Sequence, residues 1–330
     1  MRSGRFLAVV SLLLAAAGCH KSAAGVRTIA VIPQGSTHEY WKSIHAGAVK
    51  AVRDLERVGT SVKIIWKGPL REDDREQQTQ VVEGFISQGI SGIVLAPFDS
   101  RALVRPVEEA ARAGIPTVVV DSALDTDKIV SFIATDNEKG GALAADRMGE
   151  LLAGKGKVLL LRYQEGVAST QARERGFVKR LGEGYPGIEL ISSNQYAGPT
   201  RETAKRASEN LLTRYAADVA GVFTPNESST AGMLLALEDF QKAGRIAFVG
   251  FDSSETFLEA MKDGKLQGIV VQDPFRMGEL GVKAIVDHLD GKPVAGRVDT
   301  GATMVTPTNM NEPGIQRLVR PPLAQYLGGR

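Results

Sequence analysis

The sequence predicts an α/β protein built from two doubly wound lobes, each with a parallel sheet. Short apolar runs rich in β-branched residues, such as 27–32 and 117–120, are typical of strands buried on both faces. Between these runs, apolar residues recur every three or four positions, which is the period of a helix with one buried face. Strands and helices that alternate in this way form parallel sheets through right-handed crossovers. The chain has 330 residues, enough for roughly two domains of ordinary size.

The first lobe begins with the strand 27–32. A helix follows that ends at Gly59 and whose apolar stripe consists of Trp41, Ile44, Ala48, Val52 and Leu55. The same two patterns then alternate to the end of the lobe. They predict strands at 62–66, 92–96 and 117–120, and helices at 73–88 and 102–113.

The second lobe repeats the alternation after Asp136. Apolar runs predict strands at 158–161, 188–191, 221–223, 246–250 and 268–271. Periodic segments predict helices at 140–152, 169–181, 200–215, 229–242 and 254–263, and a further helix at 277–289 precedes the tail. The tail beyond 301 has no strong period and contains Pro307, Pro313, Pro321 and Pro322, so we expect it to wrap the surface as an irregular segment.

The first residues have the layout of a secretory signal. Arg2 and Arg5 precede an apolar stretch at 6–17, which is shorter than the roughly 20 residues that span a bilayer as a helix. The small residues before Cys19 resemble a bacterial lipobox, although Ala16 stands where such boxes usually have Leu. We therefore expect a lipoprotein signal peptide at 1–18, lipidation of Cys19 and a flexible tether at 19–25. The alternative is an incidental thiol at Cys19.

The charge balance argues against two classes of partner. The chain has 40 Lys and Arg against 38 Asp and Glu, and residues 1–18 contain two of the arginines and no acid. The remainder therefore carries 38 charges of each sign. A protein specialised for nucleic acid or a polybasic membrane patch shows a basic surplus instead. We expect no nucleic-acid partner, and contact with the membrane only through the lipid anchor.

Polar side chains follow several of the predicted strands. Ligands of open parallel sheets bind beyond the carboxyl ends of the strands, so these side chains are candidates for a binding site. The strand-end candidates are His38, Tyr40, Trp41, Asp121, Asn226, Asp252 and Gln272. Arg173 and Arg175, which open a second-lobe helix, add candidate cations. Carboxylates and amides bind hydroxyl groups, and aromatic rings cover apolar C–H faces, so this set suits a small neutral sugar or polyol.

Each candidate also has a structural alternative. Asp121, Asn226 and Asp252 could be helix N-caps or turn residues, since Asp and Asn are common at both places. Trp41 lies on the apolar stripe of its helix and could be a core residue. His38 could be a turn residue, and the arginines could form surface ion pairs only. The binding interpretation depends on the recurrence of the same chemistry at five strand ends.

Motifs of catalysis are absent from the sequence. Ile32 is followed by Pro-Gln-Gly-Ser-Thr-His rather than G-x-G-x-x-G, and 154–157 lacks the spacing of a phosphate-binding loop. The four histidines include no H-E-x-x-H pair. A transcriptional regulator of similar fold would need a helix-turn-helix before the first lobe, where residues 1–25 read as signal and tether. We expect no enzyme activity, catalytic residue, cofactor or metal site.

Five motifs carry a family resemblance: Ser131-Phe-Ile-Ala-Thr-Asp136-Asn137, Ala172-Arg-Glu-Arg-Gly176, Val222-Phe-Thr-Pro-Asn226, Val249-Gly-Phe-Asp252 and Gln272. Through them the chain resembles periplasmic sugar-binding proteins of the ribose-binding type, the type I substrate-binding proteins of ABC transporters. The resemblance covers 27 to about 301.

The resemblance implies how the lobes are connected. The chain would cross between them near Thr135, between Phe251 and Gln272, and near Gly301. The N-terminal lobe would then be 26–135 with 273–301, and the C-terminal lobe 136–272 with 302–330. The protein would be an exported monomer in the periplasm or cell envelope that delivers its ligand to an ABC transporter permease. The alternative is a binding protein that presents a sugar or furanosyl signal to a membrane receptor.

The resemblance also implies roles for the site residues. Tyr40 and Trp41 would enclose the sugar ring, and Asp121, Arg173, Asn226, Asp252 and Gln272 would bind its hydroxyls. His38 and Ala96 stand where ribose binders carry Asn, and Ser122 stands where they carry Arg. An aromatic residue expected near Pro199 is also missing. A sugar-type pocket is compatible with these changes, but they argue against ribose itself as the ligand.

Overall fold

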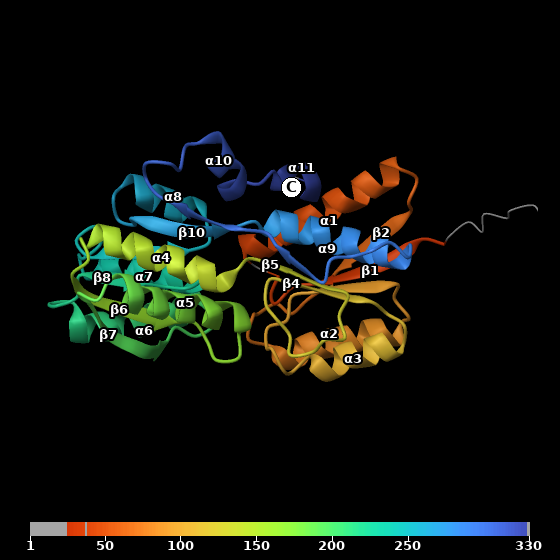
Figure 1. Ribbon diagram of the computed structural model, residues 1–330, viewed down its shortest axis with the longest axis horizontal. Coiled ribbons are helices and arrows are strands. Elements are labelled where there is room, and N and C mark those ends of the chain that lie inside the picture. The colour runs from red at the N-terminus through yellow and green to blue at the C-terminus, as the bar shows by residue number, and fades with distance from the viewer. Residues whose placement is uncertain (1–24, 37, 329–330) are drawn as a thin grey trace, which may run out of the picture.

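The computed structural model describes residues 25–36 and 38–328. The predicted signal peptide at 1–18, the lipidation site Cys19 and nearly all of the tether lie outside the described residues. Two α/β lobes lie side by side along the long axis of the molecule (Figure 1). Each contains a six-stranded sheet. The predicted two-lobe α/β fold is therefore confirmed.

The sheet of the first lobe is entirely parallel and has the strand order β2-β1-β3-β4-β5-β11. Its strands are β1 (Arg27–Ile32), β2 (Val62–Trp66), β3 (Gly92–Leu95), β4 (Thr117–Val120), β5 (Ser131–Ala134) and β11 (Arg297–Asp299). Helices α1 (Glu39–Arg57) and α9 (Pro274–Leu289) pack against one face, and α2 (Arg75–Ser87) and α3 (Val104–Arg112) cover the other (Figure 1).

The sheet of the second lobe has the corresponding order β7-β6-β8-β9-β10-β12. Its strands are β6 (Gly156–Arg162), β7 (Ile188–Tyr196), β8 (Gly221–Phe223), β9 (Ala247–Phe251), β10 (Gly268–Gln272) and β12 (Ala302–Val305). All pair in parallel except β12, which is antiparallel to β10. One face is covered by α4 (Asn137–Leu151) and α5 (Ala168–Gly184), and the other by α6 (Arg201–Tyr215), α7 (Glu227–Asp239) and α8 (Glu255–Lys262).

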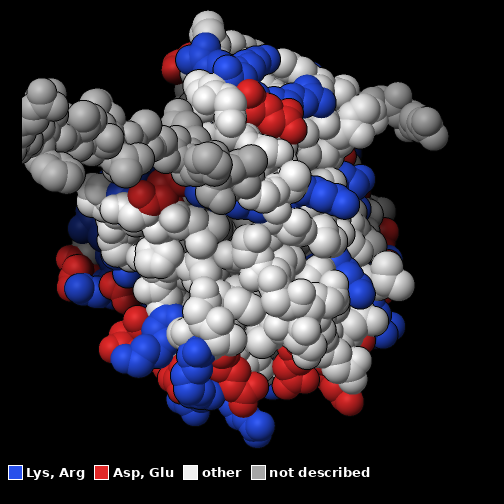
Figure 2. All heavy atoms as spheres, turned by 90° about the vertical axis from the view of Figure 1, so that its right-hand side faces the viewer, with Lys and Arg blue, Asp and Glu red and all other residues white. Residues whose placement is uncertain are grey.

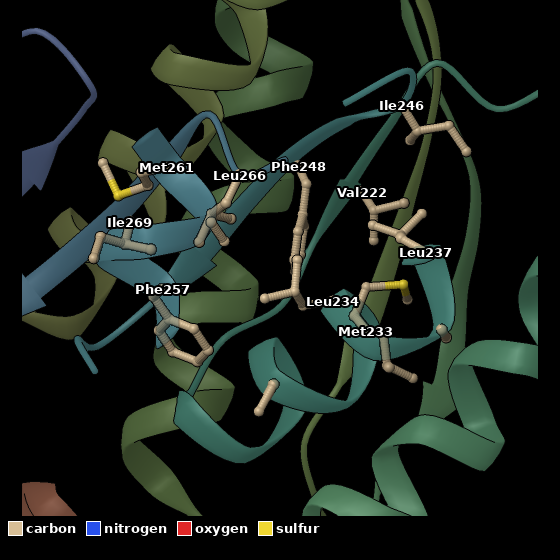
Figure 3. Close-up of a cluster of buried hydrophobic side chains, with 14 of the residues drawn as sticks. Val222, Met233, Leu234, Leu237, Ile246, Phe248, Phe257, Met261, Leu266 and Ile269 are labelled. Atoms are coloured by element: carbon tan, nitrogen blue, oxygen red, sulfur yellow. The ribbon is translucent and has the colours of Figure 1, made fainter. Parts of the chain in front are cut away.

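A core of apolar side chains fixes the second set of helices on its sheet. Val222, Phe248 and Ile269 point from neighbouring strands toward side chains of α7 and α8, among them Leu237 and Phe257 (Figure 3). Fully burying a side chain of this size contributes about 1.5–3 kcal/mol. The strand ends are therefore held by a rigid scaffold, which is what a precise polar site requires.

The chain crosses between the two sheets three times, after β5, after β10 and between β11 and β12. The second crossing comes directly after Gln272 rather than between Phe251 and Gln272, because β9 and β10 are neighbours in the same sheet. All three crossings lie at the boundary between the lobes. This boundary is therefore where a hinge motion would occur.

The prediction of an irregular tail was wrong. Residues 302–305 form β12, and α10 (Pro313–Val319) buries Ile315 and Val319 in the core of the second lobe. The last helix, α11 (Leu323–Leu327), packs on α1 of the first lobe, whereas the sequence assigned the whole tail to the second. These elements have four to seven residues, too few for a helical or strand period to be recognised.

The surface agrees with the balanced charge. On the end of the first lobe, basic and acidic groups are interspersed around the margin and uncharged side chains fill the centre (Figure 2). The described residues form no broad basic patch on this face. Among the residues of 25–36 and 38–328, no helix combines the length and the apolar character needed to cross a membrane.

Candidate binding site between the lobes

Two aspartates occupy corresponding positions in the lobes. Asp121 follows β4 and Asp252 follows β9, the fourth strand of each sheet in chain order. Both adopt left-handed backbone, with φ of 65° and 66°. Such a conformation costs a non-glycine residue on the order of 1–3 kcal/mol, and Asp tolerates it better than most. Neither residue is a helix N-cap, so this alternative is excluded for both.

One cavity at the lobe boundary brings all eight predicted site residues together. Its volume is about 40 Å³, room for roughly three water molecules. A sugar-sized molecule therefore requires the lobes or the lining side chains to move apart. The predicted residues in the lining are His38, Tyr40, Trp41, Asp121, Arg173, Asn226, Asp252 and Gln272. The sequence did not single out the others, which are Gln34, Glu72, Tyr163, Val167, Ser169, Thr170 and Glu227.

The first lobe contributes Asp121 and the groups that hold it. Tyr40 donates its hydroxyl to Oδ1 of Asp121 at 2.6 Å, and Gln34 Nε2 donates to Oδ2 at 3.2 Å. Burial raises the pKa of Asp121 to about 6, although Arg173 and the Tyr40 hydrogen bond favour the carboxylate. Burial, together with the charge of Asp121, raises the pKa of Tyr40 well above its ordinary value. Tyr40 is therefore a hydrogen-bond donor and not a base.

The second lobe contributes Asp252 and its neighbours. Gln272 Nε2 donates to Oδ1 of Asp252 at 2.8 Å, and the backbone N–H of Glu227 donates to Oδ2 at 3.1 Å. Burial raises the pKa of Asp252, while Arg173 opposes this shift. Both carboxylate oxygens are thus fixed by bonds within the protein.

Arg173 is buried and held by three contacts. Its Nε donates to Oδ1 of Asn137 at 2.8 Å, and its Nη1 donates to the carbonyl of Pro225 at 2.9 Å. Its guanidinium carbon lies 4.0 Å from the ring centroid of Phe251. The alternative of a surface ion pair is excluded for this residue. Arg175, the other candidate, pairs with Glu138 at the surface and does not line the cavity.

Asn226 lines the cavity and is also the N-cap of α7. Its Oδ1 accepts the backbone N–H of Ser229 at 3.3 Å and the Ser229 hydroxyl at 2.5 Å. Its Nδ2 donates to the Ser228 hydroxyl at 3.1 Å. The helix therefore uses part of the hydrogen-bonding capacity that a ligand would need.

Glu72 is the most connected residue that sequence reasoning missed. Its Oε1 accepts the indole N–H of Trp41 at 2.6 Å and lies 2.9 Å from Nδ1 of His38. Its Oε2 accepts the hydroxyl of Tyr163, from the second lobe, at 2.8 Å. Burial favours the neutral acid, but these partners outweigh it and lower the pKa of Glu72. Burial likewise disfavours the charged form of His38, yet the bond to Glu72 raises its pKa.

Trp41 lies both in the apolar core of the first lobe and in the lining of the cavity. It is 3% exposed and packs in the apolar cluster of the first lobe, as its helical position allowed. It also lines the cavity and meets the Tyr40 ring edge to face, with centroids 5.0 Å apart. Core packing and ligand contact are therefore not exclusive alternatives for this residue.

The lobes touch each other directly around the cavity. The backbone N–H of Ser169 donates to the Ser122 hydroxyl at 3.2 Å, and that of Ser100 donates to the Gly166 carbonyl at 3.1 Å. With the Tyr163–Glu72 bond, these contacts close the boundary. The lining can bind polar groups, and among residues 25–36 and 38–328 no cluster of three or more His, Cys, Asp or Glu is placed to hold a metal ion.

Known proteins match the chain across this architecture. Residues 29–293 match the periplasmic binding protein domain family. The ribose import binding protein of Bacillus subtilis is 33% identical over 224 residues, covering 68% of this chain and 71% of that protein. The corresponding protein of Haemophilus influenzae is 27% identical over 303 residues, covering 92% and 99%.

A solved structure is similar in both sequence and fold. The carbohydrate transporter solute-binding protein of Agrobacterium radiobacter, in complex with D-arabinose, superposes with a TM-score of 0.83 at 32% identity. The match covers 90% of this chain and all of that one. These relatives are binding components of transport systems and not enzymes. The chain therefore belongs to the periplasmic binding protein domain family, among the sugar-binding proteins of the ribose type.

Proposed function

We propose that this chain captures a small sugar or polyol between its two lobes and delivers it to an ABC transporter permease. The observation that carries the proposal is the composition of the cavity, whose lining comes from both lobes. A ligand that contacts both surfaces has higher affinity for the closed form, so its binding shifts the hinge toward closure. A permease could then distinguish the loaded protein from the free one by shape.

The lining supports a polyhydroxylated ligand. Carboxylates, amides and a buried guanidinium offer fixed acceptors and donors, and Tyr40, Trp41 and Tyr163 offer rings. Relatives bind several sugars, as the names of the ribose import proteins and the bound D-arabinose show. Ser122 is uncharged and accepts a hydrogen bond from Ser169 of the second lobe, whereas the family resemblance places an arginine at this position, and this difference supports a ligand other than ribose.

We propose that the protein works as an exported monomer anchored through Cys19. The family is periplasmic, and the sequence before Cys19 resembles a lipobox. A lipid on the first mature residue, followed by a short tether, would hold the protein near its permease while leaving the hinge free.

A thermal-shift screen over pentoses, hexoses and alditols tests the function. A ligand present at 100 times its dissociation constant adds about 2.7 kcal/mol of stability to the folded state. The best compounds are then titrated calorimetrically against wild type and Asp252→Asn. The variant keeps the shape and the left-handed tolerance of the residue but loses its charge, so affinity should fall about tenfold or more.

Asp127→Asn is the matched control, since the side chain of Asp127 is 86% exposed and does not line the cavity. It should bind the ligand as wild type does. A screen with no stabilising sugar or polyol would reject the proposal, and equal affinity of wild type and Asp252→Asn would remove Asp252 from the site.

A further inference from the structure

The cavity contains more negative than positive groups. Four carboxyl groups line it, and each residue is at most 8% exposed: Glu72, Asp121, Glu227 and Asp252. The cations in the lining are Arg173 and His38, whose bond to Glu72 raises its pKa. Arg201 adds one more charge from outside the lining, through its ion pair with Glu227. A buried charge without a partner is costly, so this surplus favours a guest that is positively charged.

Within the part of the chain that the structure describes, two hydrogen-bond acceptors of the lining have no donor. They are Oε2 of Glu227 and Oε1 of Gln272, both buried. The other oxygens of the four carboxylates each accept a bond within the protein. His38 Nδ1 lies 3.8 Å from Oε2 of Glu227, which is too far for a hydrogen bond.

The residues that carry the two unpaired acceptors are both bonded to Asp252. The side chain of Gln272 and the backbone of Glu227 each donate to one of its oxygens. Leaving a buried acceptor unpaired costs on the order of 1–3 kcal/mol, so a ligand that supplies donors here gains that energy. The site therefore selects for a donor at this particular end of the cavity.

We propose that the ligand carries a protonated amine, as an amino sugar or an amino-substituted polyol does, and that its ammonium group donates to Glu227 and Gln272. This inference rests on the proposed function and narrows its substrate class. A hydroxyl donates one hydrogen bond and leaves the negative surplus in place. An ammonium donates up to three and compensates a charge. The bond to Glu227 is then charge-assisted on both sides, the stronger kind.

Matched pairs of compounds test the inference by calorimetry at pH 7. D-glucosamine is compared with D-glucose, D-galactosamine with D-galactose, and 1-amino-1-deoxy-D-glucitol with D-glucitol. At least one amine should bind about tenfold or more tightly than its parent, the effect of one charge-assisted bond. The N-acetyl derivatives of the two amino sugars should lose this advantage, because acetylation removes the charge.

Glu227→Gln assigns the effect to the proposed acceptor. It should abolish the preference, so that the amine and its neutral parent bind the variant with the same affinity. Glu150→Gln, at an exposed helix position, is the control and should keep the preference. Parents that bind wild type as tightly as the amines overturn the inference and leave the proposed function intact. Failure of both series and of all neutral sugars and alditols overturns both. The wild-type comparison decides the question even if Glu227→Gln does not fold.

Discussion

Some residues of the cavity lower the stability of the free protein and at the same time favour ligand binding. Asp121, Asp252 and Glu227 are buried carboxyl groups whose pKa values are raised, with burial as the leading cause. A carboxyl that is easier to protonate in the folded state than in the unfolded one destabilises the fold once it is charged. The free protein therefore keeps these charges at an energetic cost, which a ligand with matching donors offsets.

At the scale of single residues, we predict how the stability of the fold depends on pH through Asp121. The pKa of Asp121 is raised to about 6, against an ordinary value of about 4. Between these values the folded state holds a proton that the unfolded state has lost, so stability falls as pH rises from about 4 to 6. Asp121→Asn should flatten this part of the profile and be more stable than wild type above pH 6, by on the order of 2 kcal/mol. Urea unfolding from pH 4 to 7.5 measures both curves.

Parallel curves for the two proteins would contradict this assignment. Glu174, whose pKa burial raises to about 7, contributes in the same direction in both proteins and cancels in the comparison. Glu72 contributes in the opposite direction, since its pKa is lowered, and cancels likewise.

Strand ends explain which site residues the sequence could predict. Asp121, Asp252 and Gln272 directly follow or end apolar runs, so a rule about carboxyl ends finds them. Glu72 lies in a charged stretch six residues after β2, where its neighbours are exposed and no pattern separates it from them. Glu227 stands in the first turn of α7, where an acidic residue is common because it suits the helix dipole, so no local pattern marks it as a site residue. Their function depends on tertiary contacts, which the local sequence does not encode.

Among the helices and strands, some are predictable from the local sequence and others depend on tertiary contacts. Long helices such as α1 and α9 were predicted because burial of one face imposes a period of 3.6 residues. β11 and β12, with three and four residues, exist because neighbouring strands offer an edge to pair with. An edge created by the rest of the fold leaves no signal in the segment that occupies it.

The end of the chain forms a strap between the lobes, defined here as residues 320–327. At the second lobe, Arg320 donates two hydrogen bonds to Glu255, at 2.6 and 2.8 Å. At the first lobe, Arg53 donates to the carbonyls of Gln325 and Tyr326, at 2.8 and 3.3 Å. Pro321 and Pro322 lie between these contacts and restrict the backbone. In Figure 1, α11 accordingly lies beside α1 and α9.

Loss of the strap should favour the open form. Deleting residues 321–330 removes the contacts with Arg53, so the ligand-free protein should have a larger radius of gyration in solution scattering. Affinity should fall several-fold, because a smaller closed population lowers the apparent affinity of a ligand that needs it. Arg53→Ala should show part of the effect. Arg57→Ala, on the same helix and 76% exposed, should show none.

Identical scattering curves for the full-length and truncated proteins would show that the strap does not hold the lobes. The scattering measurement decides between the two outcomes, because the deletion also alters the binding cavity directly. A cavity of about 430 Å³ beneath the strap shares Tyr40, Asp252 and Gln272 with the binding cavity, so deletion exposes these residues as well.

The whole molecule is a repeated unit with a site at the junction. Both sheets have the same order through their first five strands, and the fourth strand of each ends in a left-handed aspartate. Burial of each core stabilises one lobe, whereas the contacts across the boundary combine hydrogen bonds with one small buried cluster of Phe98, Tyr163 and Val167. We therefore expect the lobes to move as two rigid bodies about the three crossings.

At the scale of the whole molecule, we predict that a lipid on Cys19 anchors the protein to a membrane. Expressed in a bacterium with its own leader, the protein should be cleaved before Cys19 and partition into detergent. Cys19→Ser should leave it unprocessed or release it in soluble form, with sugar binding unchanged. Mass spectrometry of the mature N-terminus and phase partitioning provide the measurement. Wild-type protein that is unlipidated and cleaved elsewhere would exclude the anchor.

The position of the strap can also be used to follow the state of the protein by fluorescence. The Tyr326 ring lies 5.4 Å from that of Phe275, at the start of α9, so the last helix docks where the crossing from the second lobe enters the first. A fluorescent dye on a cysteine introduced at Gln325, paired with a second dye on the far lobe, would report docking as energy transfer. The energy-transfer signal would then report the ligand concentration. No residue of the cavity would have to be changed.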